Sequence, residues 1–220
     1  MRKHVVLSLS GGLDSTSLLA WLLEHEYAVT PVIFMYGSKH NKYENEAAKK
    51  VCRHYQLAPI ECDLSKIFSV FKSNLLASGG PIPEGHYSDE TMKQTVVPGR
   101  NLIFISILAG IAESVGADNV AIGVHAGDHA IYPDCRPLFI KLADDIIFAS
   151  TEAKVALLAP FLHVNKAQVL SFALRNNSPI ELTRTCYKDQ PIACGKCGSC
   201  VERLEAFDIN GMRDVIEYEN

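Results

Sequence analysis

The sequence predicts a doubly wound α/β fold, with a mostly parallel sheet covered by helices on both faces, plus a small C-terminal zinc-binding segment. Three observations carry this prediction. Short apolar runs alternate with helical patterns, as in parallel sheets that are buried on both faces. A Ser-Gly-Gly turn joins the first strand to the first helix, and four cysteines cluster late in the chain. We expect a main domain over residues 1–180 and a cysteine-rich segment over 181–220.

The first half of the chain supplies three of the expected strands. Apolar runs predict strands at residues 5–9, 30–35 and 59–62. Between them, apolar residues recur at helical spacing, and Leu18, Leu19 and Leu22 form the inner stripe of the first helix. Helices are expected at residues 14–26, 43–55 and 64–76.

The second half continues the alternation. Residues 100–115 and 139–149 carry helical patterns on either side of a strand at 119–123, and a further strand is expected at 155–158. Asn165 and Gln168 have the spacing of a capping box, which predicts a helix that continues to about Arg175. A last helix is expected at 201–207.

Two segments interrupt this rhythm. Residues 78–98 contain glycines and prolines with few apolar residues, and a loop of this length inside a compact domain is typically a lid or a binding loop. We take it as the candidate lid. Residues 124–137 form a polar loop after the strand at 119–123, at the sheet edge where open parallel sheets bind ligands.

Composition narrows the class of protein. The chain has 220 residues, 48% hydrophobic and 21% charged, with a net charge of −4, which suits a globular protein with a full core. There is no basic excess that would indicate nucleic-acid binding. Neither a signal peptide nor an apolar run long enough for a membrane span is apparent. We therefore expect a cytoplasmic protein, in which the seven cysteines do not form a disulfide framework.

The Ser-Gly-Gly turn predicts an anion site. Adjacent glycines allow a tight turn, and the following helix start offers free N–H donors and the positive end of its dipole. The loop lacks the Lys-Ser/Thr pair of a Walker A motif. The residues expected to hold the phosphates of a nucleotide are Leu9, Ser10, Gly11, Gly12, Leu13, Asp14, Ser15 and Thr16.

The cysteine cluster predicts a metal site. Its members are Cys186, Cys194, Cys197 and Cys200. Four thiolates favour a closed tetrahedral site, so the expected ion is one structural Zn²⁺ per chain. An iron–sulfur cluster and a redox Cys-x-x-Cys pair are the alternatives.

Polar residues of three further segments are candidates for binding the substrate. Arg100 and Asn101 open a helix, where a positive residue opposes the dipole unless it meets an anion. The loop at 124–137 and the helix at 166–175 add further candidates, which are Asp128, Tyr132, Asp134, Arg136 and Lys166. Cys135 in the same loop is a potential nucleophile, but a binding or packing role is favoured.

These motifs together carry a family resemblance. The Ser-Gly-Gly-x-Asp-Ser loop resembles that of the N-type (PP-loop) ATP pyrophosphatases. With Val97–Asn101, the Tyr-Pro-Asp-Cys-Arg stretch at 132–136 and the cysteine tail, the chain resembles the 7-cyano-7-deazaguanine synthase family from about residue 4 to 208. Two stretches depart from the family pattern: Tyr-Gly-Ser-Lys-His at 36–40, where many relatives have Tyr-Gly-Gln-Arg-His, and Leu-Ala-Pro at 158–160, where relatives often have Glu-Thr-Pro.

The resemblance implies an activity. It implies an ATP-dependent carbon–nitrogen ligase that converts 7-carboxy-7-deazaguanine and ammonia to 7-cyano-7-deazaguanine through adenylated intermediates, in queuosine biosynthesis. Asp14, Ser15 and Arg100 would be the catalytic residues, and Asp14 would help to place Mg²⁺ with ATP. Asp128 or Asp134 would accept hydrogen bonds from the guanine-like edge. The resemblance also implies a homodimer that binds no membrane and no nucleic acid.

Three other functions remain as alternatives. A tRNA sulfurtransferase would use the same ATP-binding core, although the acidic balance and the lack of an RNA-binding module argue against it. A specialised relative would adenylate another carboxylate or stop at an amide. A non-catalytic nucleotide-binding protein would bind ATP without forming AMP.

Overall fold

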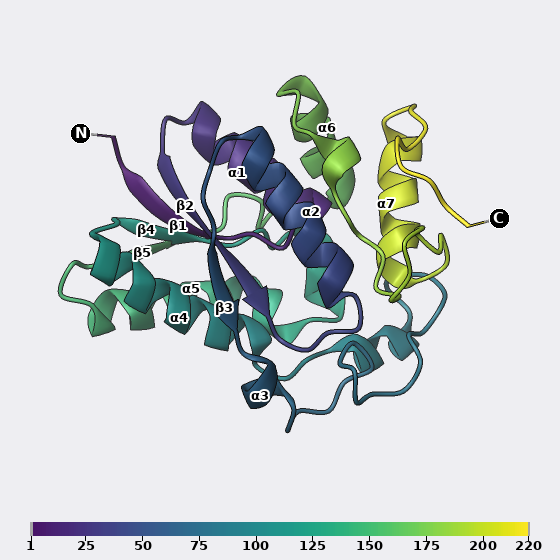
Figure 1. Ribbon diagram of the computed structural model, residues 1–220, viewed down its shortest axis with the longest axis horizontal. Helices are drawn as coiled ribbons and strands as arrows, with labels where there is room; N and C mark the ends of the chain where they lie inside the picture. Colours follow the sequence, from purple (N-terminus) through teal and green to yellow (C-terminus); the bar gives the residue numbers. More distant parts are fainter. Residues whose placement is uncertain (1, 220) are drawn as a thin grey trace.

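The computed structural model describes residues 2–219 and contains a parallel sheet of five strands in the order β3-β2-β1-β4-β5 (Figure 1). In the central strand, Val6 pairs with Thr30 on one side and with Val120 on the other. All the strand pairs in this sheet are parallel. The strands are β1 (His4–Ser8), β2 (Ala28–Met35), β3 (Ile60–Asp63), β4 (Asn119–Ala121) and β5 (Ala156–Leu158).

Helices cover both faces of the sheet, which confirms the predicted fold class (Figure 1). One face carries α1 (Leu13–Glu24), α2 (Asn41–His54) and α6 (Lys166–Arg175), and the other carries α4 (Arg100–Val115) and α5 (Pro137–Ser150). The remaining helices are α3 (Ser65–Phe68), α7 (Gly198–Ile209) and short 3-10 turns at Glu90–Thr95, Ala126–Ala130, Pro133–Cys135 and Ile180–Leu182.

The alternation of strand side chains explains this layering. Val5 and Leu7 of β1 are fully buried against α1 and α2, whereas Val6 between them is fully buried against α4. Successive side chains of a strand point to opposite faces, so a strand buried on both sides reads as a continuous apolar run. This is the pattern from which the sequence predicted the strand.

One predicted helix is wrong. Residues 64–76 form only the single turn α3, followed by irregular chain. The backbone there bonds to another loop, because Lys39 donates to the Leu75 carbonyl and Ala77 donates to the Gly37 carbonyl. Phe68 and Leu75 are still buried, so their apolar spacing reflects burial without helical geometry. The other predicted elements are present with ends shifted by a few residues.

The strand order places a ligand-binding crevice between β1 and β4. The chain leaves β1 toward β2 and leaves β4 toward β5, in opposite directions along the sheet, and open α/β sheets bind ligands at such a switch point. Gly123 follows β4 here, and a Cβ at this position would lie 3.2 Å from the Asp14 carbonyl carbon and the Ser15 nitrogen. The absence of a side chain lets the two loops approach.

The C-terminal segment packs against the main sheet domain. Helix α7 lies along α6, and its Arg203 is completely buried. The guanidinium pairs with Asp214 at 2.6 Å and donates to the Thr183 hydroxyl at 2.7 Å.

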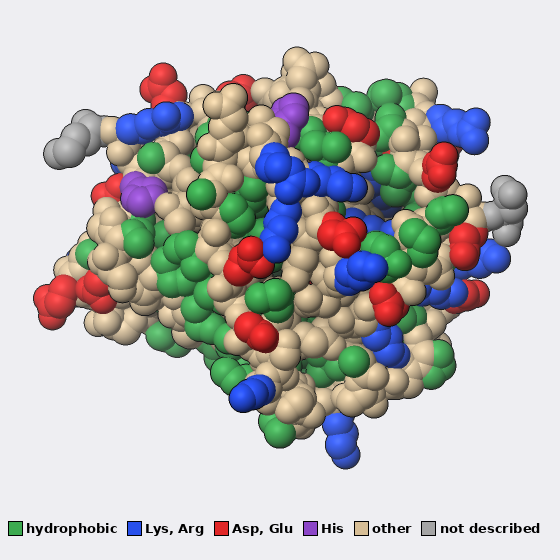
Figure 2. Space-filling view, in the orientation of Figure 1, with side chains coloured by type: hydrophobic (Ala, Val, Ile, Leu, Met, Phe, Trp, Pro, Cys, Tyr) green, Lys and Arg blue, Asp and Glu red, His purple; other side chains and the backbone are tan. Residues whose placement is uncertain are grey.

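Acidic and basic side chains are interspersed over the face shown in Figure 2. Within residues 2–219, no helix combines the length and apolar character that a membrane span requires.

Candidate active site

A cavity of about 190 Å³ opens at the carboxyl edge of the sheet and collects most of the predicted site residues. From the Ser-Gly-Gly loop it is lined by Leu9, Ser10, Gly12, Leu13, Asp14 and Ser15. From the predicted substrate residues it is lined by Arg100, Asn101, Asp128, Tyr132 and Lys166. Gly11, Thr16, Asp134 and Arg136 do not line it.

The loop itself is held by its serines. The Ser10 hydroxyl accepts from the Gly12 N–H at 3.2 Å and lies 3.0 Å from the Ser15 hydroxyl. Gly11 has a φ of +81°, and a Cβ there would lie 2.3 Å from the backbone nitrogen of Ala48. Its carbonyl accepts from the Arg184 N–H at 2.8 Å. The loop is therefore a preformed turn at the start of α1, with its helix N-terminus open to the cavity.

A buried ion pair faces this loop. Lys166, at the start of α6, lies 2.6 Å from Asp14 Oδ2 and 3.5 Å from Glu202 Oε2. Burial acts to raise the pKa of Asp14, but the interactions with Lys166 and with the neighbouring His125 outweigh it, and the pKa is lowered. Burial likewise acts to lower the pKa of Lys166, but the surrounding carboxylates raise it. At neutral pH the cavity thus presents an ammonium group beside an ionised carboxylate.

Asp14 has the chemistry of a magnesium ligand. Its Oδ2 pairs with Lys166, whereas Oδ1 is buried and accepts no hydrogen bond within residues 2–219. A buried oxygen of this kind requires a partner, and carboxylate oxygens are ligands that Mg²⁺ prefers. The residues present therefore fit a magnesium ion bound with ATP.

His125 joins the loops on the two sides of the crevice. Its side chain is 1% exposed, and its Nε2 lies 3.8 Å from carboxylate oxygens of Asp14, Asp128 and Glu202. Its Nδ1 accepts from the Gly127 N–H at 3.1 Å. A Cβ on Gly127 would lie 2.4 Å from Glu202 Oε1, so a side chain at this position would displace the carboxylate. The sequence places His125 in the polar loop but assigns it no role.

The start of α4 explains the placement of Asp134 and Arg136. Asp134 Oδ2 accepts from the Asn101 N–H at 2.9 Å, so this carboxylate caps the helix that Arg100 begins. Arg136 is exposed and donates to the His129 carbonyl at 2.9 Å. Both residues are therefore engaged outside the cavity, whereas Arg100 lines it.

Cys135 lies in the cavity wall as a neutral thiol. Its Sγ accepts from Asn101 Nδ2 at 3.3 Å, and its side chain is buried. Burial raises the pKa of this thiol well above its ordinary value, to which Asp128 contributes. A thiol held in this way is a poor nucleophile, which agrees with a binding or packing role.

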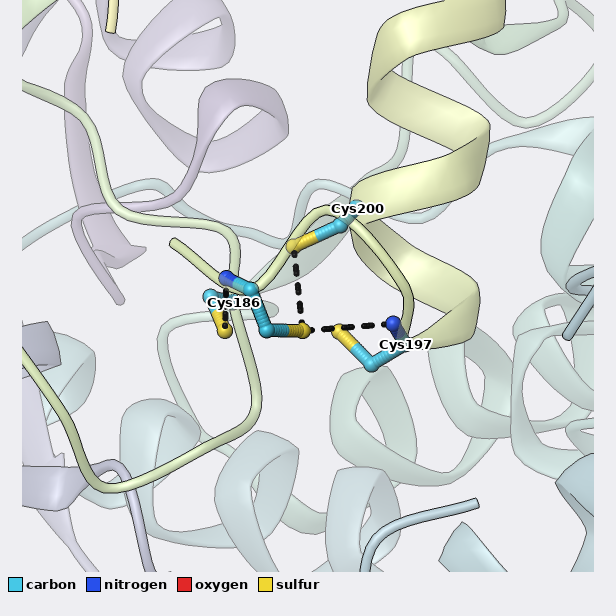
Figure 3. Close-up of side chains that lie close together, drawn as sticks. Cys186, Cys197 and Cys200 are labelled. Carbon is cyan, nitrogen blue, oxygen red and sulfur yellow. Dashed lines mark hydrogen bonds between the residues drawn. The ribbon is translucent and has the colours of Figure 1, made fainter. Parts of the chain in front are cut away.

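The four cysteines gather around one point, as Figure 3 shows for the three that it labels. All four are buried, and their sulfur atoms lie within 4.8 Å of one another. Cys194 Sγ and Cys200 Sγ are 4.0 Å apart, close to the separation of about 3.8 Å that follows from four Zn–S bonds of about 2.3 Å in a tetrahedron. Backbone N–H groups also point at the sulfurs, as from Cys197 to Cys194 at 3.3 Å. The donor set therefore fits a single tetrahedral metal ion.

Several cavity residues escaped sequence reasoning. The cysteine segment and α7 supply Arg184, Thr185, Tyr187, Ser199 and Glu202, and the region after β2 supplies Tyr36, His40 and Glu44. The only sequence signal for the latter group was the Tyr-Gly-x-x-His stretch at 36–40, which was compared with relatives but not placed in the site. Ser199 and Glu202 carry no local signal, because they look like ordinary polar residues of an amphipathic helix.

The fold and the loop define the class of protein. The sheet with its Ser-Gly-Gly loop has the fold expected from the sequence resemblance to the PP-loop ATP pyrophosphatases. A 4-thiouridine synthetase solved as an RNA complex with bound ATP superposes with a TM-score of 0.51 at 19% identity, covering 92% of this chain and 50% of that longer chain. At this identity the likeness shows the fold alone.

The family follows from the sequence comparisons. The chain belongs to the family described as queuosine biosynthesis protein QueC, whose model matches residues 4–211. It is 42% identical over 219 residues to the 7-cyano-7-deazaguanine synthase of Pseudoalteromonas atlantica, with 100% of both chains covered. It is also 42% identical to the synthase of Caldicellulosiruptor bescii, with 98% of this chain and 97% of the relative covered. These comparisons confirm the resemblance on which the sequence analysis relied.

Proposed function

We propose that the protein converts 7-carboxy-7-deazaguanine, ammonia and ATP to 7-cyano-7-deazaguanine, AMP and pyrophosphate. The observation that carries the proposal is the joint presence, in one cavity, of the serine–glycine loop and the buried Lys166–Asp14 pair, in a chain of the QueC family. The full-length relatives bear the name of this reaction.

The chemistry proceeds in two activations. A substrate carboxylate oxygen attacks the α-phosphorus of ATP, and pyrophosphate leaves. The carboxylate oxygen, a poor leaving group, thereby becomes part of an acyl adenylate from which AMP can leave. Ammonia then forms the C–N bond as the C–O bond to AMP breaks, and the released proton passes to solvent. A second ATP activates the amide oxygen in the same way, and loss of AMP with the remaining N–H protons gives the nitrile.

Several cavity residues have a task in this scheme. N–H groups at the start of α1, with the Ser10 and Ser15 hydroxyls, hold the β- and γ-phosphates. Lys166 and Arg100 stabilise negative charge that develops on the phosphates and on the acyl adenylate. Asp14 orients Lys166 and would hold Mg²⁺, which supplies charge neutralisation at the leaving pyrophosphate. Asn101 and Tyr132 contact the 7-carboxy-7-deazaguanine.

Further parts of the proposal concern the metal, the assembly and the cell. The cysteine cluster would hold one structural Zn²⁺, since no ligand position is left open. A homodimer is supported by Leu138, Leu142 and Ile146, which are 50–68% exposed on one side of α5 at a spacing of four residues. We place the protein in the cytoplasm and expect no nucleic-acid partner, in line with its net charge of −4.

The proposal is tested by turnover of the purified protein with ATP, Mg²⁺, ammonium and 7-carboxy-7-deazaguanine. Nucleotides and bases are followed by mass spectrometry. We expect two AMP per nitrile formed, and Asp14→Asn should remove both products. Formation of the amide alone would mean a shortened reaction. Lack of substrate-dependent AMP from zinc-loaded protein would refute the proposal.

A further inference from the structure

One end of the cavity contains a set of side chains that the phosphate chemistry does not use. We call it the acceptor end, and it is formed by Tyr36, His40, Glu44, Phe104 and Tyr187. The loop after β2 and the first turn of α2 supply three of these residues. The rings of Tyr36 and Phe104 meet edge-on at 5.6 Å, and the ring of Tyr187 lies 5.3 Å from that of His40.

His40 is buried with half of its hydrogen-bonding capacity unused. The residue is 3% exposed, and its Nε2 lies 3.4 Å from Glu44 Oε2. Nε2 is the ring nitrogen that faces this carboxylate, and in a neutral imidazole that donates from Nε2 the other nitrogen, Nδ1, is an acceptor. Within residues 2–219 the buried Nδ1 has no hydrogen-bond partner. Buried polar atoms of proteins are almost always paired, so the lack of a partner for Nδ1 indicates that a ligand supplies one.

Glu44 adds a second acceptor beside the first. Its side chain is 16% exposed, and in the described part of the chain its carboxylate accepts no hydrogen bond, apart from the contact with His40. A carboxylate has only acceptor sites when ionised. The acceptor end therefore presents two neighbouring acceptors, the His40 Nδ1 lone pair and a Glu44 oxygen, and complements a ligand with two neighbouring N–H donors.

The other carboxylates near the cavity are used differently. Asp134 caps α4 outside the cavity, and Asp128 accepts from the backbone N–H of His125 at 3.2 Å. Asp14 and Glu202, which also line the cavity, both lie within 3.8 Å of Lys166 and His125. Glu44 is thus the carboxylate that remains for a neutral donor edge. The aromatic rings beside it provide the apolar walls that a flat heterocycle needs.

We propose that the acceptor end selects the substrate base, and that Glu44 and His40 bind the adjacent ring N–H and exocyclic amine of an aminopyrimidinone. This inference rests on the proposed function and identifies residues that would set its specificity. A guanine-type edge offers two donors in a row, whereas the corresponding edge of adenine alternates a donor with an acceptor. The acceptor end therefore accepts the deazaguanine and rejects the adenine of ATP, which keeps the two substrates in separate places.

The test compares two ligands in wild-type protein and two variants. Calorimetry measures the binding of 7-carboxy-7-deazaguanine and of its 2-deamino analogue, and separately of ATP. The variant Glu44→Gln keeps the shape of the side chain but turns one acceptor into a donor. Glu46→Gln, an exposed position of the same helix, is the matched control.

We expect Glu44→Gln to weaken binding of the substrate by about ten-fold or more, because a hydrogen bond to a charged group is lost. The weakening should be several-fold smaller for the 2-deamino analogue, and ATP binding and Glu46→Gln should match the wild type. Equal weakening for both bases, or a loss of ATP affinity, would overturn the inference. The proposed function is judged separately, by whether the wild type forms substrate-dependent AMP.

Discussion

Gly11 is the position where one added methyl group tests the geometry of the Ser-Gly-Gly loop. Its φ is +81°, and a Cβ would lie 2.3 Å from the Ala48 nitrogen, a backbone atom that cannot rotate away. The left-handed conformation costs an alanine about 1–2 kcal/mol, and overpacking costs about 1–3 kcal/mol. Gly11→Ala should therefore lower the free energy of unfolding by about 2–5 kcal/mol, or Tm by about 4–20 °C for a chain of this size.

Gly37→Ala provides the control for this experiment. Gly37 also has a positive φ, +74°, but a Cβ there would meet nothing within 4 Å. It should lose only the conformational part, about 1–2 kcal/mol. Urea unfolding of the ligand-free proteins measures both differences. If Gly11→Ala costs no more than Gly37→Ala, the close approach of the loop to α2 is not a constraint and the reasoning fails.

Four further predictions follow from the site. Lys166→Met should lower the free energy of unfolding by about 3 kcal/mol, because the carboxylate of Asp14, which is 23% exposed, loses its cation. Unchanged stability in urea unfolding would argue against the pair. The folded-state pKa of Asp14 lies below its ordinary 3.8, so its ion pair stabilises the fold above that pH and is lost as the pH falls. The difference in the free energy of unfolding between the wild type and Asp14→Asn should therefore shrink when unfolding is measured at increasingly acid pH. Gly127→Ala should slow the formation of AMP, because the added methyl group displaces Glu202. Gly110→Ala, with open space around its Cβ, should leave this rate unchanged. If the cysteine cluster holds a metal ion, its removal by a chelator, followed by restoration of Mg²⁺, should lower both Tm and ATP affinity; unchanged ATP affinity would show that the cluster does not support the cavity.

Local sequence signals predicted those parts of the fold that depend on local patterns. The apolar run of β1, the turn at Gly11 and the capping box at Asn165 each act within a few residues, and each is present in the structure. The helix expected at 64–76 failed because its polar backbone groups bond to residues far away in the sequence. Apolar spacing reports burial, but it does not report where the backbone finds its partners.

The candidate site was predictable to the same extent. The four cysteines were found together as expected, because their spacing is itself the signal. Glu44 and Glu202 were missed because nothing near them in the sequence distinguishes them from surface residues. They enter the cavity through the packing of α2 and α7, and the cavity joins residues as far apart in the sequence as Ser8 and Glu202.

The position of Glu202 also has a consequence for how the protein is made. The phosphate loop is complete when residue 16 has been synthesised, yet the carboxylate that lies 3.5 Å from Lys166 belongs to a helix near the other end of the chain. A chain emerging from the ribosome would therefore carry its phosphate loop through most of translation without a finished cavity around it. Nascent chains of this protein should be unable to bind ATP or convert it to AMP until α7 has packed against the rest of the chain.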